Sequence, residues 1–136
     1  MFFINGDAGV VEFGMGTTGD LPIAGDFDDD GTDEVGLYRP STSEFFFRDE
    51  NTAAGTISTR VLGTSGDEGL VGDWDADGAA TPGVRRDLGF GFFFLNNMAS
   101  GTDVDVMFGL GDASDGVVVG DFDGPTVDED GCNVAN

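Results

Sequence analysis

The chain has 136 residues and a formal net charge of −22, because it carries 27 acidic residues against 5 arginines and no lysine. Such a surface repels nucleic acid and anionic lipid, which need clustered cations, so we expect no nucleic-acid partner. The sequence has no histidine and a single cysteine, Cys132. The usual base for a serine or cysteine nucleophile and the usual zinc ligands are therefore missing, and we expect no enzymatic activity.

The acids are mostly aspartate, and 24 residues are glycine. Both residue types favour turns and are poor helix formers, so a helical protein is not expected. No stretch approaches 18 consecutive apolar residues, which argues against membrane insertion. Phenylalanine, valine, leucine and isoleucine are nevertheless frequent enough to form a packed core.

Short apolar runs separated by Gly, Asp, Ser, Thr and Asn predict strands by their length and their β-branched and aromatic content. In chain order the predicted strands cover residues 2–4, 35–39, 45–48, 57–61, 69–72, 82–86, 92–95, 104–108 and 117–119. Alternation puts Ile57, Thr59 and Val61 on one face, which we expect to be the buried one. The apolar runs 45–47, 92–94 and 117–119 do not alternate, which predicts strands covered on both faces.

A repeat organises these strands. The sequence Gly-Asp-aromatic-Asp begins at Gly25, Gly72 and Gly120, at spacings of 47 and 48 residues. Other segments keep the same period, since residues 35–39 match 82–86 and residues 45–49 match 92–96. Each period holds four short strands, which is the expected unit of a β-propeller blade.

We therefore expect an all-β fold, a β-propeller-type array of four-stranded antiparallel blades. The chain would hold about three blades and be cut between the first and second strands. It forms a single repeat domain, 1–136, with blades at about 1–34, 35–81 and 82–127 and a candidate closing strand at 128–136. A β-sandwich is the alternative, although a long exact repeat argues against it.

Three blades are fewer than the four to eight of most propellers, and an open array leaves strand edges bare. We expect such a chain to self-associate through its exposed blade edges and its C-terminal strand, as a ring or as a filament. The alternative is that the chain is an excised piece of a larger extracellular or halophilic propeller.

An aspartate-rich loop follows each Gly-Asp-aromatic sequence. In the first loop the acids Asp26, Asp28 and Asp30 alternate, Gly31 permits a sharp turn, and Asp33 and Glu34 follow. Ca²⁺ takes six to eight oxygen ligands, and alternate residues of a tight loop point inward to supply them. Four or five carboxylates in one loop repel each other unless a cation lies among them. We expect Asp26, Asp28 and Asp30 to bind Ca²⁺ with Thr32 through its carbonyl group and Asp33 or Glu34 through its carboxylate.

The other two loops depart from this pattern. The second has Asp73, Asp75 and Asp77 in the same positions, with Ala79 and Thr81 in the places of Thr32 and Glu34, so we expect weaker binding. The third keeps Asp121 and Asp123, but Pro125 replaces the third aspartate and the glycine is displaced. Neither of the first two loops is an EF-hand, because position twelve is Leu37 in the first and Val84 in the second instead of a bidentate glutamate.

Asp-aromatic-Asp-x-Asp-Gly followed by Val-Gly-Leu-Tyr-Arg-Pro, as in residues 26–40, resembles the calcium-binding FG-GAP or VCBS-type repeats of extracellular proteins and integrin-like propellers. The resemblance extends over nearly the whole chain in about three copies. It implies a β-propeller with Ca²⁺ in its loops, an extracellular or cell-surface location, and a role in adhesion or surface architecture.

Our leading hypothesis is a secreted or cell-surface calcium-binding repeat protein that serves structural self-assembly or adhesion. A carbohydrate-binding propeller module is the alternative, and it predicts exposed aromatic side chains beside a polar cleft. The five arginines could contact an acidic glycan, but amid 27 acids we expect them to pair with neighbouring carboxylates.

Overall fold

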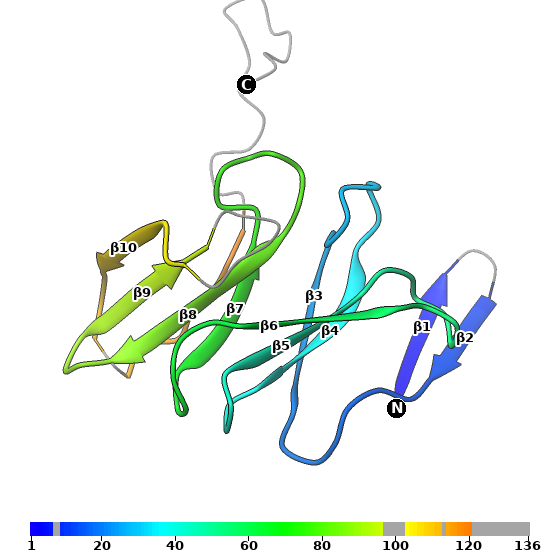
Figure 1. The fold of residues 1–136 in the computed structure, drawn as a ribbon, viewed down its shortest axis with the longest axis horizontal. Helices are drawn as coiled ribbons and strands as arrows, with labels where there is room; N and C mark the ends of the chain where they lie inside the picture. Colours follow the sequence, from blue (N-terminus) through cyan, green and yellow to red (C-terminus); the bar gives the residue numbers. More distant parts are fainter. Residues whose placement is uncertain (7–8, 97–102, 113, 121–136) are drawn as a thin grey trace, which may run out of the picture.

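The structure is a computed structural model that describes residues 1–6, 9–96, 103–112 and 114–120. It is all-β, as expected, and its described residues form ten strands in antiparallel sheets of two, four and four strands (Figure 1). Within the described ranges no helix has the length and apolar character needed to cross a membrane.

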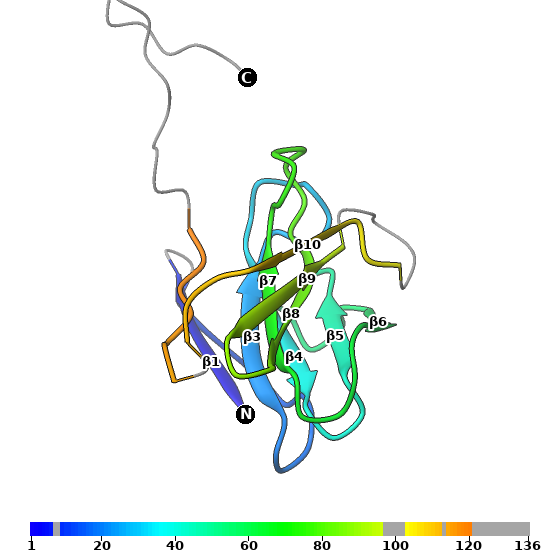
Figure 2. The ribbon, with the colours of Figure 1, turned by 90° about the vertical axis from the view of Figure 1, so that its left-hand side faces the viewer.

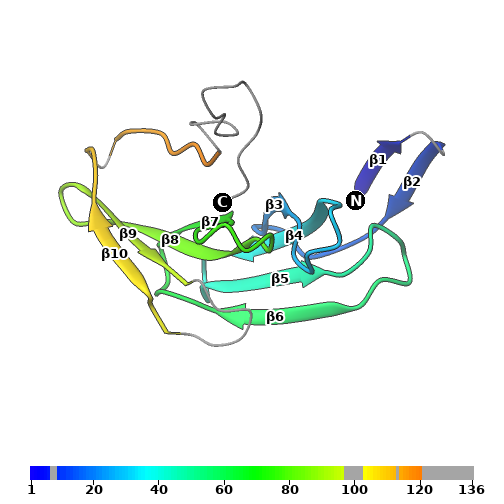
Figure 3. The ribbon, with the colours of Figure 1, turned by 90° about the horizontal axis from the view of Figure 1, so that it is seen from above.

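The strands of each sheet pair in chain order. The N-terminal hairpin consists of β1 (Phe2–Gly6) and β2 (Gly9–Phe13). The first four-stranded sheet consists of β3 (Leu21–Gly25), β4 (Glu34–Arg39), β5 (Glu44–Arg48) and β6 (Ile57–Val61). The second consists of β7 (Glu68–Gly72), β8 (Thr81–Asp87), β9 (Gly91–Leu95) and β10 (Val106–Gly109). The N-terminal hairpin and β10 lie at opposite ends of the molecule (Figures 1 and 3).

The sheet boundaries differ from the expected blade boundaries by one strand. We expected the strand that ends in Gly-Asp to close each blade, but β3 and β7 each begin a sheet and pair with β4 and β8. The reason is the short aspartate-rich loop after β3 and β7, since such loops join neighbouring antiparallel strands as hairpins. A division after residue 34 or 81 would cut through these hairpins. The candidate closing strand 128–136 lies outside the described residues.

The two four-stranded sheets also differ from each other by one residue in register. Leu37 pairs with Phe46, whereas Val84, 47 residues after Leu37, pairs with Phe94. Between these equivalent pairs the β8–β9 hairpin therefore holds one residue more than the β4–β5 hairpin. The predicted match of residues 45–49 with 92–96 is therefore wrong, because the strand pairing displaces it by one residue. A shift by one residue exchanges the two faces of a strand.

The hydrophobic core lies between the two four-stranded sheets. Tyr38, Phe45 and Phe47 of the first sheet pack with Leu62 of the β6–β7 connection and with Val84 of β8. Tyr38 and Phe45 are fully buried, and their ring centroids are 4.6 Å apart. Burying each such side chain contributes about 1.5–3 kcal/mol, so this layer fixes how the sheets pack. Figure 2 shows the second sheet in front of the first.

The fourth strands are less buried than their alternation predicts. Ile57 and Val61 were expected on a buried face, but 47% and 44% of their surface is exposed. The reason is that β6 and β10 are the outer strands of their sheets and are covered less than the middle strands. In contrast, β5 buries Phe45 and Phe47 and half-buries Phe46, and β9 half-buries residues 92–94, so the prediction of strands covered on both faces is confirmed for β5 and in part for β9. It is wrong for residues 117–119, which form no strand and leave Val118 77% and Val119 43% exposed.

Three equivalent turns, which we call the aspartate turns, follow the last strand of each sheet. They span residues 16–20 and 63–67 and, in the third, the described residues 111–112 and 114–115, and each begins with a glycine at positive φ. In each, the final aspartate accepts a hydrogen bond of 2.8 or 2.9 Å from the backbone N–H three residues earlier. The side chain thus fixes the path of the chain from one sheet to the next.

Arginines hold the first two aspartate turns. Arg39 pairs with Asp20 at 2.8 Å, and Arg86 pairs with Asp67 at 2.7 Å. The two guanidinium groups also stack on phenylalanine rings, Arg39 over Phe46 at 4.6 Å and Arg86 over Phe94 at 4.9 Å. The expected pairing of arginines with neighbouring carboxylates is confirmed here and at Arg85, which pairs with Glu68.

Candidate metal sites

The β3–β4 loop brings four of the expected ligands together. One carboxylate oxygen from each of Asp26, Asp28, Asp30 and Glu34 lies within 4.8 Å of the others. Two oxygens bound to the same Ca²⁺ at 2.3–2.6 Å are at most about 5.2 Å apart, so this spacing fits one ion. The donors are all hard carboxylate oxygens, which is the chemistry that Ca²⁺ prefers.

Hydrogen bonds within the loop fix its shape. Asp26 accepts from the backbone N–H groups of Asp30 and Gly31 at 3.2 and 2.8 Å, and Asp30 accepts from that of Thr32 at 2.8 Å. Gly31 has a φ of 86°, a left-handed conformation that glycine adopts without strain. The sequence thus sets both the turn and the alternation that gathers the carboxylates.

Glu34 is the buried member of this group, with 2% of its surface exposed. Burial raises the pKa of its carboxyl group, and the neighbouring Asp28, Asp30 and Asp26 raise that pKa further. The backbone N–H of Phe27 donates to it at 3.4 Å and opposes this shift. A cation among these four carboxylates would favour the charged form of Glu34 and so oppose the rise of its pKa.

The β7–β8 loop repeats the same frame with fewer acids. Asp73 accepts from Asp77 and Gly78 at 3.1 and 3.0 Å, and Asp77 accepts from Ala79 at 3.0 Å. Oxygens of Asp73, Asp75 and Asp77 lie within 4.8 Å of one another, and all three residues are exposed. This loop offers three carboxylates instead of four and no buried one.

The two loops touch each other. The backbone N–H of Ala80 donates a hydrogen bond of 2.6 Å to the carbonyl of Asp26. The Asp29 carboxylate lies so close to Gly78 that a side chain there would collide with it. A metal in the first loop would therefore lie beside the second loop, at the joint between the sheets.

The other expected ligands have different positions. Glu34, and not Asp33, joins the carboxylate group, while the Asp33 carbonyl accepts from the Asn51 side chain at 2.8 Å. Thr81, in the place of Glu34, is buried and its hydroxyl donates to the Gly72 carbonyl at 3.4 Å. Thr32 and Ala79 lie in their loops as bond donors to Asp30 and Asp77. Asp121 and Asp123 lie outside the described residues.

The sequence did not point to Asn51, which fixes the end of the first loop. Its side-chain carbonyl also accepts from the backbone N–H of Val35 at 3.0 Å, so it holds the chain on both sides of Glu34. No local motif marks this residue, because it comes from the distant β5–β6 connection.

Comparisons with protein-family models, with curated proteins and with solved structures find no match.

Proposed function

We propose that this chain is a non-enzymatic, calcium-binding repeat module of a secreted or cell-surface protein, with a propeller-type arrangement of sheets, that serves structural self-assembly or adhesion. The observation that carries the proposal is the pair of equivalent loops, in which the same hydrogen-bond frame gathers four and three carboxylates. A turn without a ligand would need neither the repeated alternation nor the buried Glu34.

The position of the loops gives calcium a structural role. Each loop joins the first two strands of its sheet, and a backbone hydrogen bond links the loops of the two sheets. An ion that binds only the folded loops stabilises the native state by mass action. Calcium would therefore strengthen both the hairpins and the joint between successive sheets.

The propeller-type arrangement is supported by the regular succession of the sheets. Two equivalent four-stranded sheets pack through one aromatic core, and an equivalent aspartate turn follows each. The hairpin β1–β2 is followed by the same turn, as the last two strands of each larger sheet are.

Titration of the metal-free protein with Ca²⁺, followed by calorimetry, tests the proposal. We expect saturable binding that weakens about tenfold or more in Asp28→Asn, which removes one carboxylate from the first group. Asp33→Asn is the matched control, because it makes the same charge change in the same loop outside the group. Equal loss in both variants, or no saturable binding at millimolar calcium, would refute the metal sites.

The alternative of a carbohydrate-binding module has one observation in its favour, a hollow beside β7–β10 that contains Trp74 and Phe93. The Trp74 indole N–H already donates to the Pro82 carbonyl at 3.4 Å, and the lining is mainly apolar. Calorimetry with neutral and acidic oligosaccharides tests this alternative. It requires that an oligosaccharide binds to the wild type and that Trp74→Ala abolishes the binding.

A further inference from the structure

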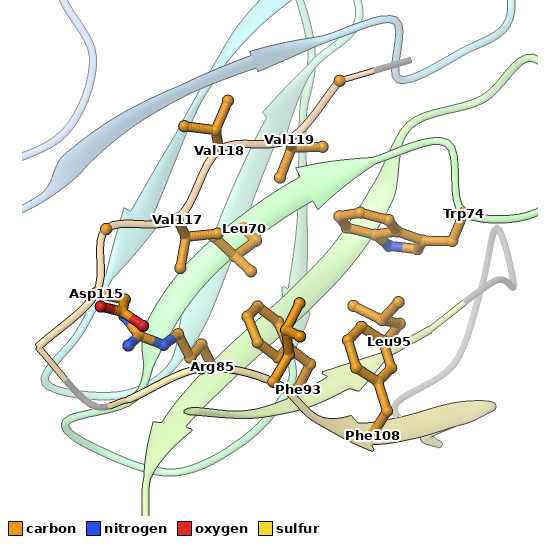
Figure 4. A pocket seen from close by; sticks show the side chains of 14 residues that line it. Leu70, Trp74, Arg85, Phe93, Leu95, Phe108, Asp115, Val117, Val118 and Val119 are labelled. Carbon is orange, nitrogen blue, oxygen red and sulfur yellow. The ribbon is translucent and has the colours of Figure 1, made fainter. Parts of the chain in front are cut away.

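The outward face of the second sheet carries a hollow of about 380 Å³. Its floor is formed by side chains from the four strands and the β7–β8 loop, and the segment 115–120 borders it (Figure 4). The main floor residues are Leu70, Trp74, Arg85, Phe93, Leu95 and Phe108. Phe93 and Phe108 stack with their centroids 5.0 Å apart.

Five of the six floor residues correspond to residues that face the second sheet from the first, whereas Phe108 corresponds to Arg60. Phe93 and Leu95 stand in the places of Phe45 and Phe47, because each pair lies one residue to either side of the equivalent Phe94 and Phe46. By the same registers Leu70, Trp74 and Arg85 stand in the places of Ile23, Phe27 and Tyr38. Ile23, Phe27, Tyr38, Phe45 and Phe47 all belong to the core between the two sheets. The hollow is therefore the same packing surface, one sheet further along.

The segment 115–120 covers part of this surface as β7 covers the first sheet. Val119 stands 48 residues after Val71, which packs against the core, and it lies over the floor in Figure 4. In the core, the second sheet also supplies Val84 from its second strand and Phe94 from its third. Among the described residues nothing takes the place of Phe94 at the hollow.

The N-terminal hairpin carries a side chain suited to that place. The last strand of each sheet has an equivalent residue three positions before the first glycine of its aspartate turn, namely Phe13, Arg60 or Phe108. These residues pair with Phe2, Phe45 and Phe93, respectively. Phe3, the next residue after Phe2, therefore corresponds to Phe46 and Phe94. It is 67% exposed, and Val10 of the same hairpin is 65% exposed.

The hairpin belongs to the opposite end of the molecule. Phe13 is buried and lies under Arg48 of the first sheet, with 4.5 Å from the guanidinium carbon to the ring centroid. The hairpin and the second sheet are thus held on either side of the first sheet (Figures 1 and 3). The hollow and Phe3 of one molecule cannot meet while this packing lasts.

We propose that the hollow binds the N-terminal hairpin of a second copy of this chain, with Phe3 of that copy over Phe93, Leu95 and Phe108. Copies then join head to tail, since the two surfaces differ. This inference rests on the self-assembly in the proposed function and names the surfaces that carry it. Each contact would repeat the packing that already joins the two sheets within one chain.

Two substitutions separate the surfaces. Phe3→Glu places a charge on the hairpin, and Phe108→Glu places one in the hollow, on an outer strand where the side chain is 40% exposed. Ile57→Glu is the control, because Ile57 is also an exposed apolar residue on an outer strand, 47% exposed, and lies in neither surface. Sedimentation is measured in saturating calcium and 1 M NaCl, because the charge of −22 makes the copies repel each other at low salt.

We expect wild type and Ile57→Glu to sediment as species larger than the monomer, and each of the other variants alone as a monomer. An equimolar mixture of Phe3→Glu and Phe108→Glu should form a 1:1 dimer, because each variant keeps one intact surface. The single tryptophan, Trp74, lines the hollow, so its emission should shift to shorter wavelength in wild type relative to Phe3→Glu.

Three outcomes would each overturn the inference. The wild type could stay monomeric when its concentration is raised 100-fold, the equimolar mixture could stay monomeric, or Ile57→Glu could be monomeric. Calcium titration of the Phe3→Glu monomer tests the metal sites separately. Retained calcium binding without assembly of the wild type would refute the head-to-tail contact alone, whereas loss of calcium binding with assembly intact would refute the metal sites alone.

Discussion

The hydroxyl group of Tyr38 donates a hydrogen bond of 2.8 Å to the backbone carbonyl of Asp67, and the Tyr38 ring covers Gly69. This contact joins the first sheet to the aspartate turn that begins the second. Arg85, which stands in the place of Tyr38, donates to the carbonyl of Asp112 at 2.7 Å in the third aspartate turn. Two different side chains in equivalent places thus each link a sheet to the turn that follows it, although they reach different residues of that turn.

Tyr38→Phe should lower the free energy of unfolding by about 1–3 kcal/mol, because it leaves the Asp67 carbonyl without its buried donor. Urea unfolding at constant calcium measures the change. Tyr38→Ala should cost about 3–5 kcal/mol, since it also empties a fully buried position. Equal stability of Tyr38→Phe and wild type would show that this hydrogen bond does not hold the sheets together.

Gly69→Ala should destabilise the protein by about 1–3 kcal/mol, because the new methyl group would meet the Tyr38 ring and the ring is too buried to move away. Gly14→Ala is the control, since no atom lies within 4 Å of a methyl group there. The two unfolding midpoints are compared in the same denaturant series. A small effect at both glycines would mean that the sheets can separate at this contact without cost.

The ion pair of Asp67 and Arg86 should contribute measurably to stability, because the carboxylate is buried and the pair shares two hydrogen bonds. We expect Asp67→Asn to cost about 1.5–3 kcal/mol. A double-mutant cycle with Arg86→Met isolates the coupling between the two side chains. A coupling near zero would assign the loss to the turn and not to the pair.

The stability of the metal-free protein should pass through a maximum as the pH falls. The pKa of Glu34 is raised above 4.5, so the native state takes up this proton before the unfolded chain does, and its protonation stabilises the fold as the pH falls towards 4.5. The pKa of Asp20 is lowered from 3.8 to about 2 by Arg39, and that of Asp67 is lowered mainly by Arg86 against the effect of burial. The stability that these two carboxylates supply above pH 3.8 is lost as the pH falls through their lowered native pKa values, towards 2 for Asp20.

Glu34→Gln isolates the first of these effects. In metal-free buffer at neutral pH the variant should be more stable than wild type, because a neutral amide replaces a carboxylate that is buried among three aspartates. In saturating calcium the order should reverse, since the variant lacks one ligand. Thermal unfolding of both proteins from pH 3 to pH 7, with and without calcium, measures the difference. A variant less stable than wild type in metal-free buffer would show that the buried carboxylate is stabilised by something other than a metal.

The sequence predicted the local structure well and the grouping of strands less well. Turn residues and apolar runs placed the strands from residue 34 to 95 to within one or two residues, because these signals are local. The second strand of the N-terminal hairpin, β2, was not predicted, since its single glutamate and flanking glycines give a weak pattern. Which strand begins a sheet depends on pairing between strands, which the period alone does not determine.

The candidate metal ligands were predicted largely from their alternation. Asp26, Asp28 and Asp30 lie together in the first loop, and the three aspartates of the second loop lie together in theirs, as the spacing predicts. The choice between Asp33 and Glu34 could not be made from sequence, because it depends on which side chain the β4 strand turns towards the core. The aspartate turns and their arginines were missed as a motif, because 19 residues separate Asp20 from Arg39.

The extra residue in the β8–β9 hairpin exchanges the faces of β9 relative to the 47-residue period, yet both faces remain aromatic because residues 92–94 are all phenylalanine. A slip of one position would ordinarily turn polar groups inward. Three identical side chains in a row remove that penalty, so one added residue in this hairpin leaves aromatic side chains on both faces. Two neighbouring sheets can therefore differ in hairpin length while the contact that joins them keeps its chemistry.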